Sequence, residues 1–386
     1  MLQEDEVAIL AVGSTIRERN AGGHIPKSVP DHPSRQETPV YKHTSREIRL
    51  KRRPVGVPTE SDFELVDVAL HDPAPGEILV RNLYMSVDPY MRGRMIERKS
   101  YVEPFEVGSV LSGGAVGEVV ASAHDGFLPG DHVLSMNGWR EDYVSDGSGH
   151  QKIDGTIAPL SSYLGALGMP GLTAYVGLLD IGKPEPEQTV FVSGAAGAVG
   201  SLVCQIAKLK GCTVVGSAGT PEKLEWLTEE AGVDVALNYK DVENLRRTLV
   251  EACPNGIDIY FDNVGGEHLE AALWRMNDHG SIIACGSISN YNATEPPPGP
   301  RNLFQVVTKR LLWKGFIVTD HYDRFPDFAR DMGSWIAAGN IKHPETLHDG
   351  IENAPKAFIG LFKGDNLGKM LVRLTPDDSQ KVPGQR

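Results

Sequence analysis

The sequence predicts an α/β protein that combines a Rossmann-type, doubly wound parallel sheet with a second, mostly β region. Residues 188–220 read as a strand, a tight glycine turn, a helix and a strand, and strands and helices then alternate to about residue 318. Short apolar runs divided by prolines and glycines fill residues 47–134. With 386 residues, 40% of them hydrophobic, the chain is long enough for two domains.

The glycine turn is the feature that most directly predicts a ligand. It follows an apolar run at residues 190–192 and precedes apolar residues at helical spacing. In a dinucleotide-binding unit, Gly197 lets the backbone approach a pyrophosphate and Gly200 lets helix and strand pack closely. Because Ala195 stands at the first position of the GxGxxG pattern, a merely structural turn is the alternative.

The same stretch has no charged residue between Glu187 and Lys208, which by length also permits a membrane span. Three glycines and the polar Ser193, Ser201 and Gln205 favour the strand, turn and helix instead. The sequence therefore predicts no membrane segment here.

The end of the second strand indicates which dinucleotide is bound. An NAD site places an acidic residue roughly 20 residues after the glycines, to bind the ribose 2′-hydroxyl. Here Ser217 and Thr220 follow, with no acid until Glu222 and then Lys223. Small hydroxylated residues and a lysine accept a 2′-phosphate, so Ser217 and Lys223 predict NADP(H). The alternative for Lys223 is a solvated side chain in the first turn of a helix.

Composition and charge exclude several function classes. A net charge of −13 and a pI near 5.4 argue against nucleic acid as a partner. The four cysteines form no CxxC pair, and His24, His32 and His43 are irregularly spaced, so no metal site is expected. Acidic residues occupy positions 4–6, where a signal peptide would be basic. We expect a reduced, cytoplasmic protein.

The first part of the chain divides into a tail and a β region. Residues 1–45 hold many prolines, glycines and charges with one aromatic residue, and we expect a disordered tail. The following β-like runs cover residues 47–54, 62–70, 76–89, 110–120 and 132–134.

The second part continues in strand and helix alternation. After an apolar helix at residues 168–182, helices are expected at 221–231, 242–252, 267–276, 325–339 and 353–362, and strands at 234–238, 257–262, 281–285 and 313–318. Residues 364–373 read as a turn into a closing strand, and a polar tail follows residue 374.

Two loops follow predicted strands at the edge where ligands bind to such sheets. Residues 262–266 (DNVGG) come after one strand and residues 286–292 (GSISNYN) after the next, so both are candidates for the nicotinamide end. The proline-rich residues 295–301 then form either a lid over the substrate or a plain connection.

Six motifs together resemble the zinc-independent branch of the medium-chain dehydrogenase/reductase superfamily, and most closely its group of prostaglandin, plant alkenal double-bond and bacterial curcumin reductases. They are NLYMSVDPYMRGRM (82–95), GMPGLTAY (168–175), GAAGAVG (194–200), YFDNVGG (260–266), CGSISNYN (285–292) and DNLGKMLV (365–372). The resemblance covers residues 47–374 and implies a homodimer.

The resemblance implies a GroES-like catalytic domain at residues 46–167 and 344–374, around a Rossmann NADP-binding domain at 168–343, with a C-terminal tail at 375–386. It also implies NADP(H) contacts from Gly197, Val199, Gly200, Lys223, Tyr239, Asn263, Cys285, Gly286, Ile288, Ser289, Tyr291 and Asn366. Phe316, Ile317 and Val318 match the strand that lines the nicotinamide in the family.

The implied reaction is reduction of the carbon–carbon double bond of an α,β-unsaturated ketone or aldehyde. Hydride adds to the β-carbon and leaves an enolate, which is then protonated at the α-carbon. The enolate needs a hydrogen-bond donor at the carbonyl oxygen, and the resemblance implies that a tyrosine and the cofactor ribose stabilise it. A tyrosine suits this role, because a phenol keeps its proton at neutral pH and can donate. Tyr291 matches the tyrosine of the family that is proposed for it. Tyr84 and Tyr90 lie in the motif that lines the substrate cleft, and for both the alternative is packing in the β core.

Two other functions remain open. A quinone oxidoreductase would have the same fold, and a non-catalytic NADPH-binding protein would keep only the cofactor site. Tyr291, Asn263 and the DPYMR segment favour an enzyme that acts on a small enone or enal.

Overall fold

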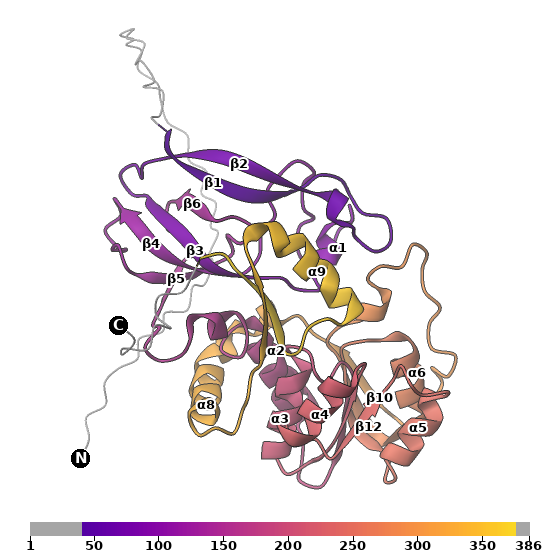
Figure 1. Ribbon diagram of the computed structural model, residues 1–386. Helices are drawn as coiled ribbons and strands as arrows, with labels where there is room; N and C mark the ends of the chain where they lie inside the picture. Colours follow the sequence, from indigo (N-terminus) through magenta and orange to yellow (C-terminus); the bar gives the residue numbers. More distant parts are fainter. Residues whose placement is uncertain (1–40, 376–386) are drawn as a thin grey trace, which may run out of the picture.

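The computed structural model describes residues 41–375, whose strands form three sheets (Figure 1). A six-stranded parallel sheet has the order β10-β9-β8-β11-β12-β13. A seven-stranded sheet has the order β14-β15-β3-β4-β5-β7, with β6 paired to β3, and β1 and β2 form an antiparallel ribbon. The predicted Rossmann sheet and the separate GroES-like β region are both confirmed.

The parallel sheet and its helices follow one another as predicted. Its strands are β8 (Thr189–Val192), β9 (Thr213–Ala218), β10 (Val235–Asn238), β11 (Ile257–Asp262), β12 (Met276–Ala284) and β13 (Leu312–Gly315). The helices are α2 (Met169–Tyr175), the π-helix η3 (Val176–Gly182), α3 (Gly200–Leu209), α4 (Pro221–Glu229), α5 (Leu245–Ala252), α6 (Gly266–Arg275), η4 (Ile288–Asn290), α7 (Gln305–Thr308), η5 (Val318–Arg324) and α8 (Phe325–Ala337).

The strand order places the ligand edge. The chain runs outward from β8 through β9 to β10, and then returns to the other side of β8 for β11, β12 and β13. The order therefore reverses between β8 and β11. In open parallel sheets, ligands bind at the carboxyl ends of the strands on either side of such a reversal.

Alternation along the strands gives the sheet two apolar faces. Val190 and Val192 of β8 pack into a cluster with α2, α3 and α8, while Phe191 between them packs into a cluster with α5 and α6. All three side chains are fully buried. A strand that is buried on both faces has a continuous apolar run, and this run is what predicts β8 from the sequence.

The β region takes strands from both ends of the described chain. It contains β1 (Tyr41–Leu50), η1 (Glu60–Asp62), β2 (Phe63–His71), β3 (Ile78–Ser86), α1 (Met91–Arg94), β4 (Ala115–Ser122), β5 (His132–Ser135), β6 (Asp142–Ser145), β7 (Gln151–Ile153) and η2 (Leu160–Leu164). After the Rossmann sheet the chain returns with β14 (Glu345–Asp349), η6 (Ile351–Asn353), α9 (Ala354–Lys363) and β15 (Lys369–Arg373).

Three sequence expectations differ from the structure. The strand β1 begins at Tyr41, so residues 41–45 belong to a strand that pairs with β2 and not to a tail. The strand β13 ends at Gly315, before the predicted limit of 318. The strands β6, β7 and β14 were not predicted. The expected tails at residues 1–40 and 376–386 lie outside the described residues.

Candidate functional site

The glycine turn joins β8 to α3 and is tightly packed. The turn begins at Gly194, whose φ of +62° favours glycine. A Cβ at Gly200 would lie 2.3 Å from the Gly194 carbonyl oxygen, so this position needs glycine for the helix to start against the turn. A Cβ at Gly197 would lie 3.3 Å from the same oxygen. The close packing predicted for Gly200 is confirmed, and Val199 stands at the N-cap of α3.

The end of β9 carries unpartnered polar atoms. The Oγ of Ser217 and the Oγ1 of Thr220 are buried and have no hydrogen-bond partner. Buried hydroxyls are normally hydrogen-bonded, so two such groups at a strand end indicate an acceptor or donor that the bound ligand supplies. They fit the predicted place of a 2′-phosphate.

Two lysines face this strand end. The Lys223 ammonium donates to the Gly364 carbonyl at 2.7 Å, which leaves donors for a further acceptor. A Cβ at Gly219 would lie 2.9 Å from Cε of Lys240, which sequence reasoning did not identify. Burial and the charge of Lys240 lower the pKa of Lys223, while Asp365 opposes this shift. An anion between the two lysines would relieve their repulsion.

Tyr239 follows β10 and stacks edge-on against His268 of α6, with ring centroids 5.0 Å apart. The Nε2 atom of His268 is buried without a partner. Burial lowers the pKa of His268 to about 4, so the ring is neutral at pH 7. No sequence pattern identifies His268, because a single histidine in a helix has no partner at a recognisable spacing.

The two predicted loops meet behind the glycine turn. Asn263 donates from Nδ2 to the Ser193 carbonyl at 2.8 Å. The N–H groups of Cys285 and Gly286 both donate to the Asp262 carbonyl at 3.0 Å. Ile288 donates from its N–H to the Asn263 carbonyl at 3.2 Å. The loops after β11 and β12 therefore form one surface beside the turn, as expected from parallel strands.

Asp262 is the buried centre of this surface. Its Oδ1 accepts from the Tyr260 hydroxyl at 2.7 Å, the Ser193 hydroxyl at 3.2 Å, and the N–H groups of Val264 at 3.0 Å and Gly265 at 2.7 Å. Burial raises the pKa of Asp262, and these hydrogen bonds oppose that shift. The carboxyl fixes the backbone that carries Asn263.

Tyr291 lies at the end of the second loop, with Ser289 on the way to it. The Ser289 hydroxyl donates to the Val264 carbonyl at 2.6 Å, and the Tyr291 hydroxyl accepts from the Ser287 N–H at 3.3 Å. Burial raises the pKa of Tyr291, so the phenol keeps its proton at neutral pH. The hydroxyl can then donate to an acceptor in front of it.

An arginine from the β region holds the same loop. The Arg92 Nε donates to Asn292 Oδ1 at 2.9 Å, next to Tyr291, and Arg92 also donates to the Gly56 carbonyl at 2.9 Å. Arg92 is buried and belongs to α1. The DPYMR segment therefore contacts the SNYN loop directly, across a long separation in sequence.

Three further phenols form a group that reaches Tyr291 through Tyr101, which is close enough to both Tyr291 and Tyr90 to affect their titration. Tyr90 stands at the N-cap of α1, and burial and the charge of Asp88 raise its pKa. Burial also raises the pKa of Tyr101, against the nearby charge of Arg94. Tyr322 of η5 is close enough to Tyr90 to affect its titration. Tyr101 and Tyr322 are more than half exposed, and sequence reasoning missed both because their positions depend on how loops fold.

Tyr84 lies elsewhere. Its side chain is 2% exposed and belongs to an apolar cluster with Leu83, Val116, Leu160 and Leu371 in the β region. Its strand β3 pairs with β4 and β15 at this point. The burial of Tyr84 favours the packing alternative.

Phe316, Ile317 and Val318 follow β13 and are not part of a strand, since Val318 starts the helix η5. A Cβ at Gly177 would lie 2.9 Å from Cζ of Phe316, so the phenyl ring packs against η3. The predicted strand is wrong at these residues because the chain turns into η5 after Gly315.

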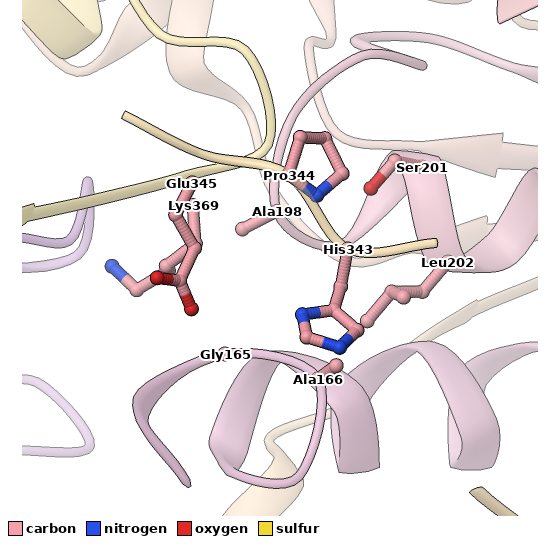
Figure 2. A pocket seen from close by; sticks show the side chains of 9 residues that line it. All are labelled: Gly165, Ala166, Ala198, Ser201, Leu202, His343, Pro344, Glu345 and Lys369. Atoms are coloured by element: carbon pink, nitrogen blue, oxygen red, sulfur yellow. The ribbon is translucent and has the colours of Figure 1, made fainter. Parts of the chain in front are cut away.

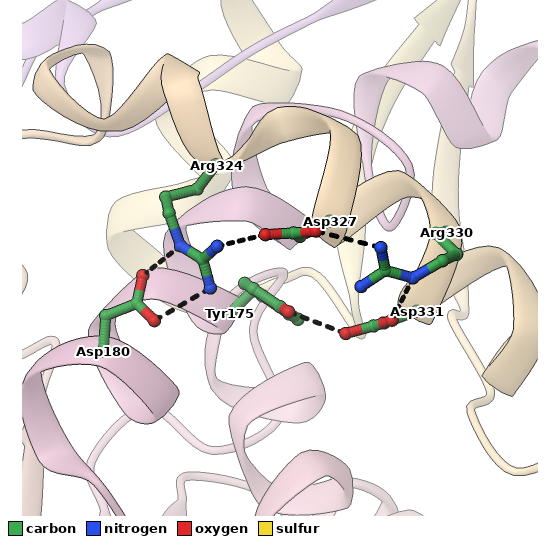
Figure 3. Close-up of polar contacts among 6 residues, drawn as sticks. All are labelled: Tyr175, Asp180, Arg324, Asp327, Arg330 and Asp331. Carbon is green, nitrogen blue, oxygen red and sulfur yellow. Dashed lines mark hydrogen bonds and ion pairs between the residues drawn. The ribbon is translucent and has the colours of Figure 1, made fainter. Parts of the chain in front are cut away.

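An ion-pair network anchors the far end of η5 (Figure 3). Arg324 donates to both carboxylate oxygens of Asp180, at 2.8 and 3.2 Å, and is also paired with Asp327. Beside it, the Tyr175 hydroxyl donates to Asp331 at 2.7 Å. A bidentate arginine has defined geometry, so the network fixes the segment that begins with Val318 against η3.

Asn366 closes the site from the β region. Its Nδ2 donates to the Gly368 carbonyl at 2.8 Å, and the Gly368 N–H donates to the Ala196 carbonyl of the glycine turn at 2.8 Å. Gly364, whose carbonyl accepts the hydrogen bond from Lys223, lies two residues before Asn366. The DNLGK segment therefore lies along both the turn and the lysine.

Between residues 41 and 375, no group of three His, Cys, Asp or Glu side chains is placed to hold a metal ion. No helix in that part of the chain is long and apolar enough to cross a membrane.

Comparison with known proteins finds matches in both regions of the molecule. Residues 46–153 match a family model for the N-terminal domain of oxidoreductases, and residues 198–334 match the model named zinc-binding dehydrogenase. The chain is 44% identical to the NADPH-dependent curcumin reductase of Escherichia coli over 87% of this chain and 99% of that protein. It is 43% identical to the NADP(+)-dependent 2-alkenal reductase of Nicotiana tabacum over 86% and 98%.

A solved structure extends the similarity to the fold. CurA from Vibrio vulnificus, in complex with NADPH, has a TM-score of 0.82 and 45% identity, covering 86% of this chain and 100% of CurA. NADP(H) is the cofactor, in agreement with the hydroxyls and lysines at the end of β9. The chain belongs to the zinc-independent medium-chain dehydrogenase/reductases, in the group of curcumin, 2-alkenal and prostaglandin reductases.

Proposed function

We propose that the protein reduces the carbon–carbon double bond of α,β-unsaturated ketones and aldehydes with NADPH. The observation that carries the proposal is the Tyr291 phenol, which is half-buried and protonated, lies near Tyr101, and follows a loop that Arg92 of the β region holds through Asn292. The curcumin and 2-alkenal reductases that the chain resembles are named for such acceptors.

The proposed cofactor site uses the residues around the glycine turn. Ser217, Thr220, Lys223 and Lys240 would hold the 2′-phosphate, and Tyr239 would lie against the adenosine. Gly197, Val199 and Gly200 would hold the pyrophosphate at the start of α3. The nicotinamide end would be lined by Asn263, Cys285, Gly286, Ile288, Ser289, Phe316, Ile317, Val318 and Asn366.

The chemistry divides between cofactor and chain. NADPH, when bound, supplies the hydride for the β-carbon of the acceptor. The Tyr291 hydroxyl donates a hydrogen bond to the carbonyl oxygen and stabilises the negative charge that develops there. Burial raises the pKa of the Cys285 thiol to about 12, so this neighbour adds no negative charge at neutral pH.

The proposal is tested by NADPH oxidation with a panel of acceptors. A 2-alkenal, an aryl enone and a quinone are compared at equal concentration. We expect the highest kcat/KM with the enal or the enone, and saturated carbonyl products. Turnover with the quinone alone would make the protein a quinone oxidoreductase, and no turnover with any acceptor would leave a non-catalytic NADPH-binding protein.

We also propose a homodimer formed through the edge of the parallel sheet. Within the described residues, β13 pairs only with β12, and its Leu312 and Trp313 are exposed next to Phe304 and Val307. An unpaired, apolar edge strand is a template for another strand. A second copy placed around a twofold axis pairs this edge with itself.

Light scattering after size exclusion tests the assembly. Wild type should have twice the mass of the chain, and Leu312→Lys should shift it towards monomer. Leu128→Lys, on an exposed residue away from this edge, is the matched control. A monomeric wild type would exclude the dimer.

A further inference from the structure

Lys369 carries a buried charge in the β region, next to the contact that Gly368 makes with the glycine turn. It is 4% exposed, and its Nζ donates to the Val87 carbonyl at 2.9 Å, to the Met370 carbonyl at 2.9 Å and to Asp88 Oδ1 at 3.1 Å. All three donors therefore have acceptors, which is what keeps a buried ammonium from being prohibitively costly. None of the functions proposed above uses this side chain.

The backbone of Lys369 is tied to the glycine turn. The preceding Gly368 donates its N–H to the Ala196 carbonyl and forms a bridge with Gly197. The Lys369 N–H donates to the Pro344 carbonyl at 3.0 Å. A Cβ at Gly368 would lie 1.8 Å from that same Pro344 oxygen, and its φ is +65°, so only glycine lets the segment lie this close.

Figure 2 shows the surroundings of this segment. Lys369 and Glu345 lie on one side of a small cavity and Ser201 of α3 lies on the other, with Ala198, just before α3, between them. Burial raises the pKa of Glu345, and Lys369 opposes this shift. The buried lysine and the start of α3, where we propose that the pyrophosphate binds, thus line the same cavity.

Asp88, the other member of the ion pair, lies directly before α1 and Tyr90. Asp88 is 6% exposed and its second oxygen accepts a hydrogen bond from the Ser86 hydroxyl. The Asp88 carbonyl accepts from the Met91 N–H at 3.1 Å, which opens α1 and places Tyr90 at its N-cap. A shift of the Asp88 carboxylate therefore moves the backbone that carries Tyr90.

We propose that Lys369 is a positioning residue that couples the glycine turn to Tyr90. The physical path runs from Ala196 and Gly197 through the Gly368 backbone to the Lys369 ammonium, and from there through Asp88 to α1. Order imposed on the turn by the cofactor is passed on to the substrate tyrosine through this ion pair. The inference rests on the proposed function for the roles of Gly197 and Tyr90.

Hydrogen exchange measures this coupling without turnover. Exchange of residues 86–95 and 194–203 is followed with and without saturating NADPH in wild type, Lys369→Met and Lys363→Met. We expect NADPH to slow exchange at both peptides in wild type and only at 194–203 in Lys369→Met. Lys363 is exposed on the same segment, and its variant should behave as wild type.

Equal protection of residues 86–95 in wild type and Lys369→Met would overturn the proposal, as would no protection there in wild type. If Lys369→Met does not fold, Asp88→Asn replaces it, because the amide keeps an oxygen acceptor but loses the charge. The protection of residues 86–95 by NADPH should then fall at least about threefold.

A double-mutant cycle separates positioning from a structural role. Lys369→Met should lower kcat/KM for an enone about tenfold in the wild-type background and less than about twofold in Tyr90→Phe, with the NADPH Kd changed little. Equal losses in both backgrounds would mean that Lys369 does not act through Tyr90. If wild type reduces no enone, the proposed function fails, while the exchange experiment still decides the coupling.

Discussion

The proposed nucleotide end and the proposed acceptor end of the site are built differently. At the nucleotide end, Ser217, Thr220 and Lys223 come from one short stretch that begins in β9, and Lys240 follows the next strand, β10. At the acceptor end, Tyr90, Tyr101, Tyr291 and Tyr322 come from four separate segments. The first end follows mainly from the local geometry of a Rossmann unit, with one contact from Lys223 to Gly364 of the β region, whereas the second requires both regions to pack together.

This difference has an energetic consequence. Groups on one strand end are positioned by backbone hydrogen bonds of the sheet, so single side chains act almost independently. The acceptor end depends on the contact of Arg92 with Asn292, which joins the regions, and on the ion pair of Lys369 with Asp88 within the β region. Variants at the nucleotide end should therefore change cofactor affinity, and variants at the acceptor end should change turnover.

The largest effect is expected for Gly200→Val, which should disrupt the nucleotide end and the acceptor end together. Gly200→Val places a side chain against the Gly194 carbonyl, where even a Cβ lies at 2.3 Å. We expect a loss of about 3 kcal/mol or more in the free energy of unfolding, measured with urea, and no measurable NADPH binding. Gly333→Ala in α8, where a Cβ meets nothing within 4 Å, is the control and should unfold as wild type or later.

Tyr291→Phe isolates the acceptor end. Loss of the donor to the carbonyl oxygen should lower kcat for an enone about 100-fold, by analogy with the removal of one oxyanion donor. The Kd for NADPH, measured by fluorescence, should stay within about twofold of wild type. Turnover within a factor of two of wild type would remove the catalytic role of Tyr291.

Lys223→Ala isolates the nucleotide end. A charge-assisted contact with the 2′-phosphate is worth about 1.5–3 kcal/mol, so the Kd for NADPH should rise roughly 10- to 150-fold. The Kd for NADH, which lacks this phosphate, should change much less. Equal changes for the two cofactors would contradict the assignment of Lys223.

The titration of Lys223 gives a smaller effect with a defined sign. Burial and Lys240 lower its pKa, and only the protonated ammonium attracts the phosphate. NADPH affinity should therefore fall as pH rises through this lowered pKa, below the usual range for lysine. The fall should be absent in Lys223→Ala, as measured by the Kd for NADPH in a pH series.

The smallest effect is expected at Tyr84. Its side chain packs in the β core, away from both ends of the cleft. Tyr84→Phe should change kcat/KM by less than about twofold, while Tyr90→Phe changes it more. A large loss of kcat with Tyr84→Phe, in a variant that unfolds as wild type does, would return Tyr84 to the site.

The sequence predicts what depends on local pattern. The buried strand at Phe191, the turn at Gly200 and the loops after β11 and β12 follow from periodicity and from glycine positions. The short strands β6, β7 and β14 carry no comparable run of apolar residues. They form because neighbouring strands supply partners.

The site residues divide in the same way. Lys223 is predicted because it follows β9 in sequence, but Lys240 and His268 reach the same end only through the sheet. Whether the Tyr84 side chain faces the core depends on the register of β3 with β4, which the alternation of apolar and polar residues does not determine. Tyr101 is placed by the loop between α1 and β4, whose path has no repeating pattern.

The central claim is that hydride reaches the β-carbon of an unsaturated carbonyl compound. It is tested most directly by reducing an aryl enone with NADPH that carries deuterium at the transferred position of the nicotinamide. The account predicts a saturated ketone with one deuterium on the β-carbon. An allylic alcohol with deuterium on the carbonyl carbon and the double bond intact would contradict it.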